Sequence, residues 1–382
     1  MTPDFTDLDY VLVTPRYPRG WRNGGEFVRT RVQAYQRAGL RGAVIDLSGS
    51  DPARHQVDGV DLLSVPASGL APLLKDAAGA RCAVLAHSPD PGVIDNLLDE
   101  VPSARLAVWF HGYELRDYRR LASNHTSREL SAITQQRRQL NADRFRAAGR
   151  LFDDGEAAVV FVSAFQRDLA HFDVGVDSRV SHVIPNHIDT ELFRARVRRP
   201  DEATKLLLMR GFTVRNYGND IALRALEHLA HRPGFDRLSI TVRGFGPLFA
   251  TETSGLRGFA NVRIEERYST PVEMAAEHFD HGVYLCPTRF DTQGVMLGEA
   301  MSSGMVTITN PVAAIPEFTD DASSLLPRPD DPIAFAEAIS WIVDHPEEMP
   351  ALSAAAADRV RRQCGYDATI ARELDLIRER TA

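Results

Sequence analysis

The sequence predicts an α/β protein with two Rossmann-like, doubly wound domains that face each other across a cleft. A chain of 382 residues suits two domains of ordinary size. Short apolar runs alternate with amphipathic stretches from end to end, as in parallel sheets covered by helices. A polar, proline-containing break near the middle separates two such series. Because ligands in these sheets bind beyond the carboxyl ends of the strands, the cleft is the expected site.

The first series of apolar runs predicts a parallel sheet. Its runs are nearly continuous rather than alternating, which indicates strands that are buried on both faces. Stretches with a helical pattern at 26–38 and 91–98 predict crossover helices between the strands. The expected strands are 10–13, 43–47, 82–85, 106–110 and 159–162.

The second series follows a charged stretch at 197–203, which contains Pro200 and predicts an interdomain linker. We therefore expect an N-terminal domain at 1–198, a C-terminal domain at 199–364, and a last helix at 365–382 that packs back toward the N-terminal domain. The expected strands of the second domain are 205–209, 238–242, 262–264, 283–286 and 306–309. Its expected helices are 219–230, 271–279, 295–303, 332–344 and 347–362.

The strongest chemical signal is the stretch from Pro287 to Gly304, in which an apolar strand leads into a loop and then a helix. Asp291 lies in the loop, and Glu299 lies about one turn inside a helix that starts near Gly294. The start of a helix offers free N–H groups and a positive dipole end to an anion. A carboxylate beside it can accept hydrogen bonds from vicinal hydroxyls. The pattern therefore indicates a site for an anion next to the hydroxyls of a sugar or ribose.

Two cations precede this block at another turn between a strand and a helix. Arg210 ends the apolar run at 205–209, and Arg215 follows five residues later, ahead of a helix. Arginine can hold phosphate oxygens through paired N–H groups, so this pair suits a diphosphate.

These motifs, in this order, resemble the E-x7-E signature of the retaining GT-B glycosyltransferases of family 4. The resemblance implies that Glu299 binds the ribose of a nucleotide-sugar donor and that Asp291 binds hydroxyls of the transferred sugar. It implies that the amides of Gly294 and Val295 lie near the sugar or the phosphates, with Gln293 also among the donor-binding residues. This chain has Asp291 where the family usually has glutamate.

The resemblance also implies the GT-B fold and net retention at the anomeric carbon. It implies that Arg210 and Arg215 stabilise the charge of the leaving group in place of a metal ion. The family pattern has lysine at the position of Arg215, so the charge is kept while the geometry of the donor group changes.

Two glycine-containing loops fit the same resemblance. Gly244 and Gly246 follow the strand at 238–242 and are similar to a G-x-G-P loop that lies close to the nucleotide in the family. Gly24 and Gly25 precede the first helix, where the family has a glycine-rich loop that approaches the donor phosphate. An ordinary tight turn is the alternative interpretation of each loop.

The N-terminal half supplies further candidates. His111 follows the run at 106–110, and the resemblance implies a contact with the donor sugar. Two roles are compatible with His111: its neutral imidazole can form a hydrogen bond with a sugar hydroxyl, or it can transfer a proton. Glu114, Arg116 and Asn186 are the candidates on the acceptor side. Asn186 lies in a Val-Ile-Pro-Asn stretch that is similar to a family passage, and a scaffold role is its alternative.

Composition and motifs disfavour several function classes. A net charge of −8 disfavours a nucleic-acid binder. Cys82, Cys286 and Cys364 form neither a CxxC pair nor a disulfide framework. The sequence has no Walker A loop and no G-x-S-x-G, which disfavours an NTPase and an α/β-hydrolase. The one DxD sequence, at 7–9, precedes the first strand, so we expect no metal ion and no cofactor.

The chain is expected to be cytoplasmic. Its first residues are acidic and polar, unlike a signal peptide, and no apolar run approaches the ~20 residues of a membrane-spanning helix. The segment 114–150 carries nine arginines and four acids, a local excess of five positive charges. This excess predicts either a solvated helical face or a surface for anionic lipid or a phosphorylated acceptor, with peripheral contact at the inner face of the membrane.

The sequence therefore predicts a metal-independent, retaining glycosyltransferase of the hexosyl type, which moves a sugar from a nucleotide-diphosphate sugar to a small-molecule, glycan or lipid-linked acceptor. Its catalytic candidates are Arg210, Arg215, Asp291 and His111. Two alternatives stay open. One is another GT-B activity, such as a sugar-nucleotide epimerase or a phosphorylase, and the other is a non-catalytic module that binds nucleotide sugars.

Overall fold

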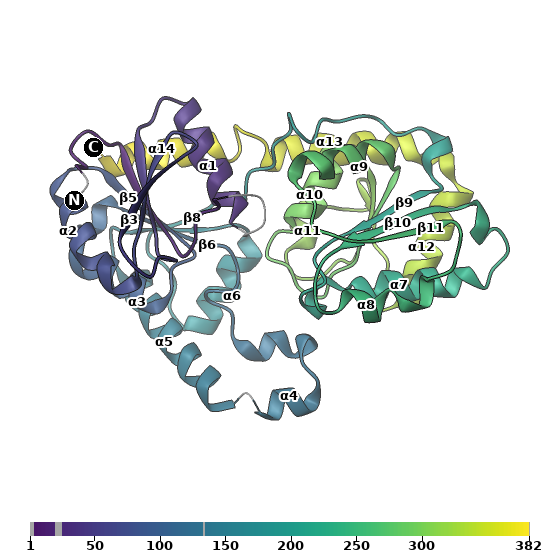
Figure 1. Cartoon of the computed structure of the whole chain (residues 1–382), viewed down its shortest axis with the longest axis horizontal. Helices are drawn as coiled ribbons and strands as arrows, with labels where there is room; N and C mark the ends of the chain where they lie inside the picture. Colours follow the sequence, from purple (N-terminus) through teal and green to yellow (C-terminus); the bar gives the residue numbers. More distant parts are fainter. Residues whose placement is uncertain (1–3, 20–24, 133, 382) are drawn as a thin grey trace. The chain divides into compact units, whose positions relative to one another are not determined.

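The computed structural model describes residues 4–19, 25–132 and 134–381, and the chain divides into two compact units. The first unit contains the chain up to Ala122, the stretch Ser127–His187, and the chain from Asp367 onward. The second unit contains Ser123–Thr126 and Ile188–Tyr366. Each unit is a sheet with helices on both faces (Figure 1).

The sheet of the first unit has the strand order β3-β4-β2-β1-β5-β6-β7-β8. Neighbouring strands are parallel except for β3 and β4, which form an antiparallel hairpin at one edge. The order reverses between β1 and β5, so the residues after these two strands lie at a topological switch point, where ligands bind in such sheets. The strands are β1 Tyr10–Thr14, β2 Gly42–Asp46, β3 Ala53–Val57, β4 Val60–Ser64, β5 Ala83–His87, β6 Leu106–Phe110, β7 Ala158–Phe161 and β8 Ser181–Val183.

Two apolar cores cover the two faces of this sheet. One core contains Leu74, Leu97 and Leu151, from the helices α2, α3 and α5. The other contains Val32 from α1 and Leu374 from α14, so the last helix of the chain packs on the first unit. The helices are α1 Glu26–Arg37, α2 Leu70–Gly79, α3 Pro91–Glu100, α4 Ser127–Ala132, α5 Thr134–Asp153, α6 Ala164–Val174 and α14 Ile370–Thr381.

The sheet of the second unit is parallel throughout, with the order β11-β10-β9-β12-β13-β14. Its order reverses between β9 and β12, which creates a second switch point. The strands are β9 Lys205–Met209, β10 Ser239–Gly244, β11 Val262–Glu266, β12 Val283–Cys286, β13 Val306–Thr309 and β14 Ser324–Leu325. The helices are α7 Asn219–Ala230, α8 Phe249–Glu252, α9 Pro271–Asp280, α10 Val295–Ser302, α11 Ile315–Phe318, α12 Pro332–Asp344 and α13 Met349–Cys364.

The predicted α/β class and both series of parallel strands are confirmed. The hairpin β3–β4 and the short strand β8 were not predicted, because their sequences lack a continuous apolar run. The units divide after His187, whereas the sequence places the boundary after residue 198. The reason is that residues between 188 and 198 are bonded within the second unit: Ile188 N donates to Cys364 O at 2.9 Å, and Ser302 Oγ donates to Phe193 O at 2.8 Å.

The arginine-rich segment 114–150 forms part of the loop after β6 and the helices α4 and α5. Acids outside the segment lie beside several of its arginines. Arg120 pairs with Asp173 at 2.5 Å, and Arg146 and Arg150 pair with Asp95 at 2.6 and 2.5 Å. The surface is therefore less positive than the count along the sequence indicates, and contact with a lipid surface stays a prediction. Within the described ranges, no helix has the length and apolar character that crossing a membrane requires.

Candidate functional site

The carboxyl ends of β9 and β12 lie side by side in the second unit, because these two strands are paired. Arg210 follows β9 and is only 4% exposed. Its Nη1 donates to Pro287 O at 2.7 Å and to Tyr217 O at 3.0 Å, and its Nη2 lies 3.3 Å from Asp291 Oδ2. The topology thus brings together Arg210 and Asp291, which are 81 positions apart in the sequence.

Asp291 also organises the start of α10. Its Oδ1 accepts hydrogen bonds from the backbone N–H groups of Gly294 (2.9 Å) and Gln293 (3.2 Å). Gly294 is the N-cap residue, with a φ of 82° that favours glycine. The first-turn amides of the helix, from Val295 onward, have no acceptor within the helix and lie at its positive end. This arrangement can hold an anion.

Glu299 lies in the second turn of α10. Its Oε2 is shielded from solvent and has no hydrogen-bond partner among the described residues, and Arg210 Nε has none either. Burial raises the pKa of Glu299 to about 8. Buried polar atoms without a partner are rare in folded proteins. Other buried atoms of the described residues, such as Trp109 Nε1, also lack a partner, so what sets Arg210 and Glu299 apart is their place in the candidate donor site.

Tyr284 lies on β12 and is fully buried. Its hydroxyl donates to Met209 O at 2.5 Å. Burial is the main cause that raises the pKa of Tyr284; the positive charge of Arg210 opposes this rise, and the negative charge of Glu299 adds to it.

Arg215 lies in a 3-10 turn at Arg215–Tyr217, and no direct contact of its side chain with Arg210 or Asp291 is among its described contacts. Its Nη1 donates to Asn124 O at 3.2 Å, and its carbonyl oxygen accepts from Arg289 Nη1 at 2.8 Å. Asn216 N donates to Asn124 Oδ1 at 2.7 Å. The described contacts of Arg215 thus hold it against the segment Ser123–Thr126, and a role at the diphosphate stays a prediction.

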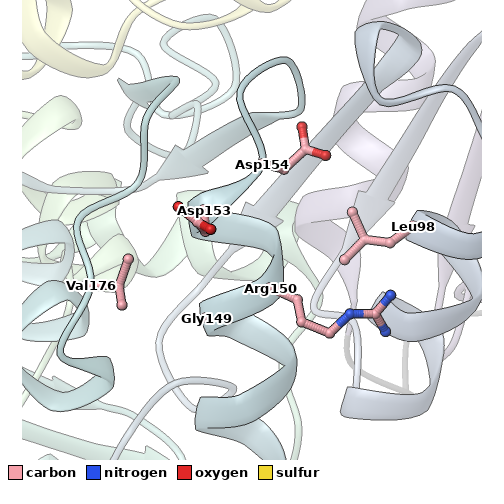
Figure 2. A pocket seen from close by; sticks show the side chains of 6 residues that line it. All are labelled: Leu98, Gly149, Arg150, Asp153, Asp154 and Val176. Atoms are coloured by element: carbon pink, nitrogen blue, oxygen red, sulfur yellow. The ribbon is translucent and has the colours of Figure 1, made fainter.

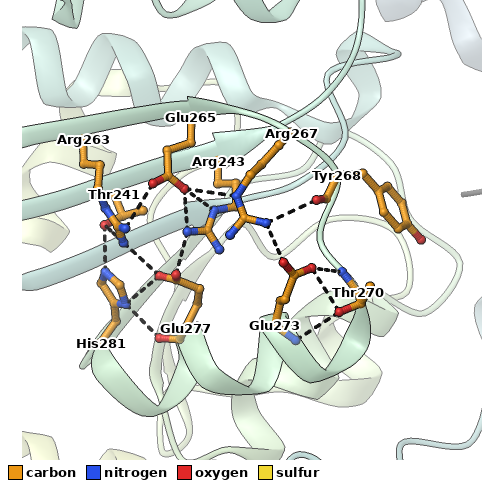
Figure 3. Close-up of polar contacts among 10 residues, drawn as sticks. All are labelled: Thr241, Arg243, Arg263, Glu265, Arg267, Tyr268, Thr270, Glu273, Glu277 and His281. Atoms are coloured by element: carbon orange, nitrogen blue, oxygen red, sulfur yellow. Dashed lines mark hydrogen bonds and ion pairs between the residues drawn. The ribbon is translucent and has the colours of Figure 1, made fainter. Parts of the chain in front are cut away.

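The loop with Gly244 and Gly246 follows β10 and lies against the residues after β9. Arg243, only 1% exposed, anchors the end of this strand: it donates to Glu265 on β11 at 2.7 Å and to Glu277 on α9 at 2.6 Å (Figure 3). Arg267 N donates to Gly244 O at 2.9 Å. This ionic network holds the glycine loop in place beside Arg210.

Gly244→Ala should destabilise the second unit by roughly 2–3 kcal/mol. An added Cβ would lie 2.1 Å from Arg210 O and 2.5 Å from the ring of Phe212, and neither neighbour can move away freely. Gly211→Ala is the matched control, because its nearest neighbour, the ring of Tyr217, lies 3.6 Å away. Thermal unfolding would show the difference, and equal midpoints for the two variants would contradict this packing argument.

The candidates of the first unit gather at the carboxyl ends of β5 and β6. His111 Nδ1 lies 3.0 Å from Asn186 Oδ1, and His111 Nε2 lies 3.0 Å from Nδ1 of His87, the last residue of β5. The ring of His111 also contacts Phe27, with the centroids 4.3 Å apart. Asn186, 6% exposed, is thus an internal contact of His111.

The carboxylate of Glu114 is buried beneath the same turn. It accepts from the backbone N–H of His111 at 3.1 Å and from that of Gly112 at 2.7 Å. Glu114 therefore stabilises the turn after β6 through these two hydrogen bonds. The sequence had instead predicted that Glu114 contacts the acceptor. Arg116 is half-buried in the following loop. Gly25 has a φ of 84° at the N-cap of α1, and Gly24 lies outside the described residues.

His87 and His111 should make the first unit sensitive to acid. Burial, with the charge of Arg31 as a further cause, holds the pKa of each histidine well below its usual range. Both stay neutral in the folded unit, while the unfolded chain binds protons below about pH 6.5. The free energy of unfolding should therefore fall as the pH drops below 6.5, by up to about 1.4 kcal/mol per pH unit for each histidine.

Urea unfolding at pH 5.5, 6.5 and 7.5 measures this fall. His111→Gln should reduce it, because the unfolded chain of the variant has one fewer histidine to protonate. A fall of the same size in the wild type and the variant would contradict the account. Between pH 7.5 and 8.5 the histidines should make no difference.

A separate pocket of about 720 Å³ lies elsewhere in the first unit, around the end of α5 (Figure 2). Its charged groups are bonded to neighbours: Arg150 pairs with Asp95, Asp153 with Arg179, and Asp154 accepts from Ser103. None of the candidate site residues lines this pocket. This pocket is therefore distinct from the candidate site at the strand ends.

Comparison with known proteins identifies the architecture. Residues 204–345 match the family model of the glycosyl transferases group 1. Sucrose-phosphate synthase from Thermosynechococcus elongatus superposes with a TM-score of 0.72 at 15% identity, over 97% of this chain and 98% of that one. The chain has the GT-B fold. The fold class and the resemblance to GT-B glycosyltransferases that the motifs predicted are both confirmed.

Other GT-B structures are similar over nearly their whole length. A UDP-forming α,α-trehalose-phosphate synthase from Burkholderia xenovorans, in complex with glucose-6-phosphate, has a TM-score of 0.68 at 14% identity, with 98% of this chain and 100% of that chain covered. HepE from Anabaena, in complex with UDP and glucose, has a TM-score of 0.66 at 13% identity and covers 96% and 98% of the two chains. No curated protein matches the sequence.

Several residues beside the candidate residues of each unit were not predicted from the sequence. His87 could have been found, because it ends an apolar run and precedes a turn, as His111 does. Tyr284 lies inside an apolar run and carries no such signal. Arg31 and Glu373 are 342 positions apart, and only the fold brings them together.

Proposed function

We propose that this chain is a retaining glycosyltransferase that transfers a sugar from a nucleotide-diphosphate sugar without a metal ion. Two buried atoms that have no partner among the described residues, Arg210 Nε and Glu299 Oε2, carry the proposal, because they lie within a domain that matches the glycosyl transferases group 1. A donor supplies what each atom lacks. A phosphate oxygen accepts from the guanidinium group, and ribose hydroxyls donate to the carboxylate.

The second unit is assigned to the donor. The first-turn amides of α10 would bind a phosphate or the polar edge of the sugar, and Gln293, Gly294 and Val295 belong to this region. Asp291 would accept from a hydroxyl of the sugar, while its contact with Arg210 orients both side chains. The loop with Gly244 and Gly246 lies beside Arg210 and is assigned to the nucleotide.

In the proposed reaction an acceptor hydroxyl forms a bond to the anomeric carbon as the bond from that carbon to the phosphate oxygen breaks. The nucleoside diphosphate leaves with the electron pair, and the proton of the acceptor passes to a departing phosphate oxygen. Arg210 stabilises the negative charge that develops on the leaving group, with Arg215 as a second candidate. Retention of configuration follows from the family resemblance.

The first unit is assigned to the acceptor, with Arg116 as its candidate contact. The similar GT-B structures include synthases of sucrose phosphate and trehalose phosphate, and one of them binds glucose-6-phosphate. We therefore propose a small-molecule acceptor, with sugar phosphates as the first class to test. Peripheral contact with anionic lipid through the segment 114–150 is a further proposal, which flotation with anionic vesicles would test.

A thermal-shift screen of UDP, GDP and ADP sugars tests the donor, because a ligand that binds the folded state raises the unfolding midpoint. Incubation of the stabilising donor with a panel of sugars and sugar phosphates should then release the nucleoside diphosphate. NMR of the product would show whether the anomeric configuration is retained. Turnover that survives an excess of EDTA would support a reaction without a metal ion.

The same assay separates the alternatives. An epimerase would isomerise the donor with no acceptor present, and a phosphorylase would consume it with inorganic phosphate. A binding module would be stabilised by a donor without turning it over. If no nucleotide sugar raises the unfolding midpoint, the proposed function is wrong.

A further inference from the structure

A buried chain of polar contacts runs through the first unit, from the last helix to the ends of β5 and β6. It begins on α14 and α1, passes through one residue after β8, and ends at the residue after β6 and the last residue of β5. Its members are Glu373, Tyr35, Arg31, Asn186, His111 and His87.

The charged end of the chain is an ion pair without solvent contact. Arg31 is 1% exposed and Glu373 is 0% exposed. Arg31 Nε lies 2.9 Å from Glu373 Oε1, and Tyr35 OH donates to Glu373 Oε2 at 2.5 Å. Removal of one partner from such a buried pair leaves an uncompensated charge. The guanidinium group of Arg31 has N–H donors and no acceptor, so it can only donate hydrogen bonds.

Arg31 determines which way the amide of Asn186 faces. Its Nη2 lies 3.1 Å from the Asn186 side chain, and a donor-only group at this distance requires the carbonyl oxygen Oδ1 there. The same oxygen lies 3.0 Å from His111 Nδ1. A carbonyl oxygen can accept two hydrogen bonds, so His111 must carry its proton on Nδ1 to complete the second one.

The tautomer of His111 determines the tautomer of His87. Because a neutral imidazole has one N–H, a proton on Nδ1 leaves His111 Nε2 as an acceptor. His87 Nδ1 lies 3.0 Å from it and must therefore donate. His87 Nε2 is left as an acceptor, and this buried atom has no partner among the described residues. Each tautomer thus follows from the cation at the start of the chain.

We propose that Arg31 and Glu373 are positioning residues, which fix His111 as its Nδ1–H tautomer through the amide of Asn186. The proposal rests on the proposed function for the place of His111 in the site, and the tautomer itself is independent of that function. With both nitrogens of the ring engaged, His111 presents a fixed ring and a fixed turn to the substrate, and it does not exchange a proton. The last helix contributes to the site through Glu373.

NMR of the full chain with ¹⁵N-labelled histidine tests the tautomer directly. At pH 7.5 the wild type should show His111 with a protonated Nδ1 and an unprotonated Nε2, and His87 should have the same tautomer. Comparison with His111→Gln and His87→Gln assigns the signals. A protonated Nε2 on His111 in the wild type would overturn the proposal, whatever the variants do.

Arg31→Met removes the cation that orients the amide. Asn186 can then turn its NH2 group toward His111, so a population with the proton on Nε2 of His111 should appear, and His87 should change with it. Adding Asn186→Asp should restore the Nδ1–H form at pH 7.5, because a carboxylate has no N–H group to present. Arg31→Lys should keep the Nδ1–H form. An unchanged tautomer in a folded Arg31→Met variant would refute the role of Arg31.

Arg29→Met is the matched control, because Arg29 lies on the same helix in a more exposed pair with Asp58. It should leave both tautomers and the rate unchanged. Arg31→Met should lower kcat by about 10- to 100-fold with little change in the KM for the donor, since a small misplacement of a site residue has an effect of this size. Glu373→Gln should lower kcat in the same direction. If the tautomers change while kcat does not, the link to catalysis is wrong and the proposed function stands.

Discussion

Arg210→Lys should lower kcat/KM for the donor by about 10²- to 10³-fold, the loss expected when one group that stabilises developing charge is removed. Lysine keeps the positive charge but has a single compact donor group. It cannot bond at once to Pro287 O, Tyr217 O and Asp291 while it also offers an N–H to a phosphate. Steady-state kinetics with a saturating acceptor would measure the loss.

Arg232→Lys is the control for this variant. Arg232 follows α7 in the same unit, where its guanidinium contacts His228 of that helix, and it takes no part in the candidate site. Its replacement should leave kcat/KM within about twofold, because substitutions away from buried networks have small effects. Equal rates for the Arg210→Lys variant and the wild type would remove Arg210 from the mechanism.

Glu299→Gln should have opposite effects on stability and on donor binding. The pKa of Glu299 is about 8 in the folded state, above its value in the unfolded chain. The carboxyl therefore lowers the free energy of unfolding progressively as the pH rises from about 4.5 to 8. Glutamine lacks this charge, so the variant should be more stable at pH 8. Because the side chain of Glu299 is partly exposed, solvent screens part of the effect. We therefore expect the free energy of unfolding of the variant to be higher by roughly 1–2 kcal/mol.

Donor binding should weaken in the same variant by about 10- to 100-fold, because hydrogen bonds to a charged group contribute about 1.5–3 kcal/mol. Calorimetry at pH 7 in buffers of different ionisation enthalpy should also show that the wild type releases protons when it binds the donor. The reason is that ribose hydroxyls favour the ionised carboxylate. A loss of stability at pH 8, or unchanged affinity, would show that Glu299 is a structural residue.

Only some of the strands could be predicted from the sequence. Runs such as 106–110 and 283–286 are apolar at every position, which requires burial on both faces of a parallel sheet. The structure bears this out for Trp109 and Leu285. The hairpin β3–β4 escaped prediction because an edge strand is exposed and carries charged side chains such as Arg54. Its pairing depends on a partner strand that no local pattern identifies.

Local patterns in the sequence predict the fold class, the two series of strands, and the block from Asp291 to Glu299, because burial patterns and helix starts are local properties of the chain. Which distant groups meet depends on the tertiary structure. It placed Arg210 on Asp291, held Arg215 against Asn124, and joined Arg31 to a carboxylate of the last helix. Hydrogen bonds and ion pairs act over a few ångströms, and the distances between these residues depend on how the strands are ordered and the helices packed.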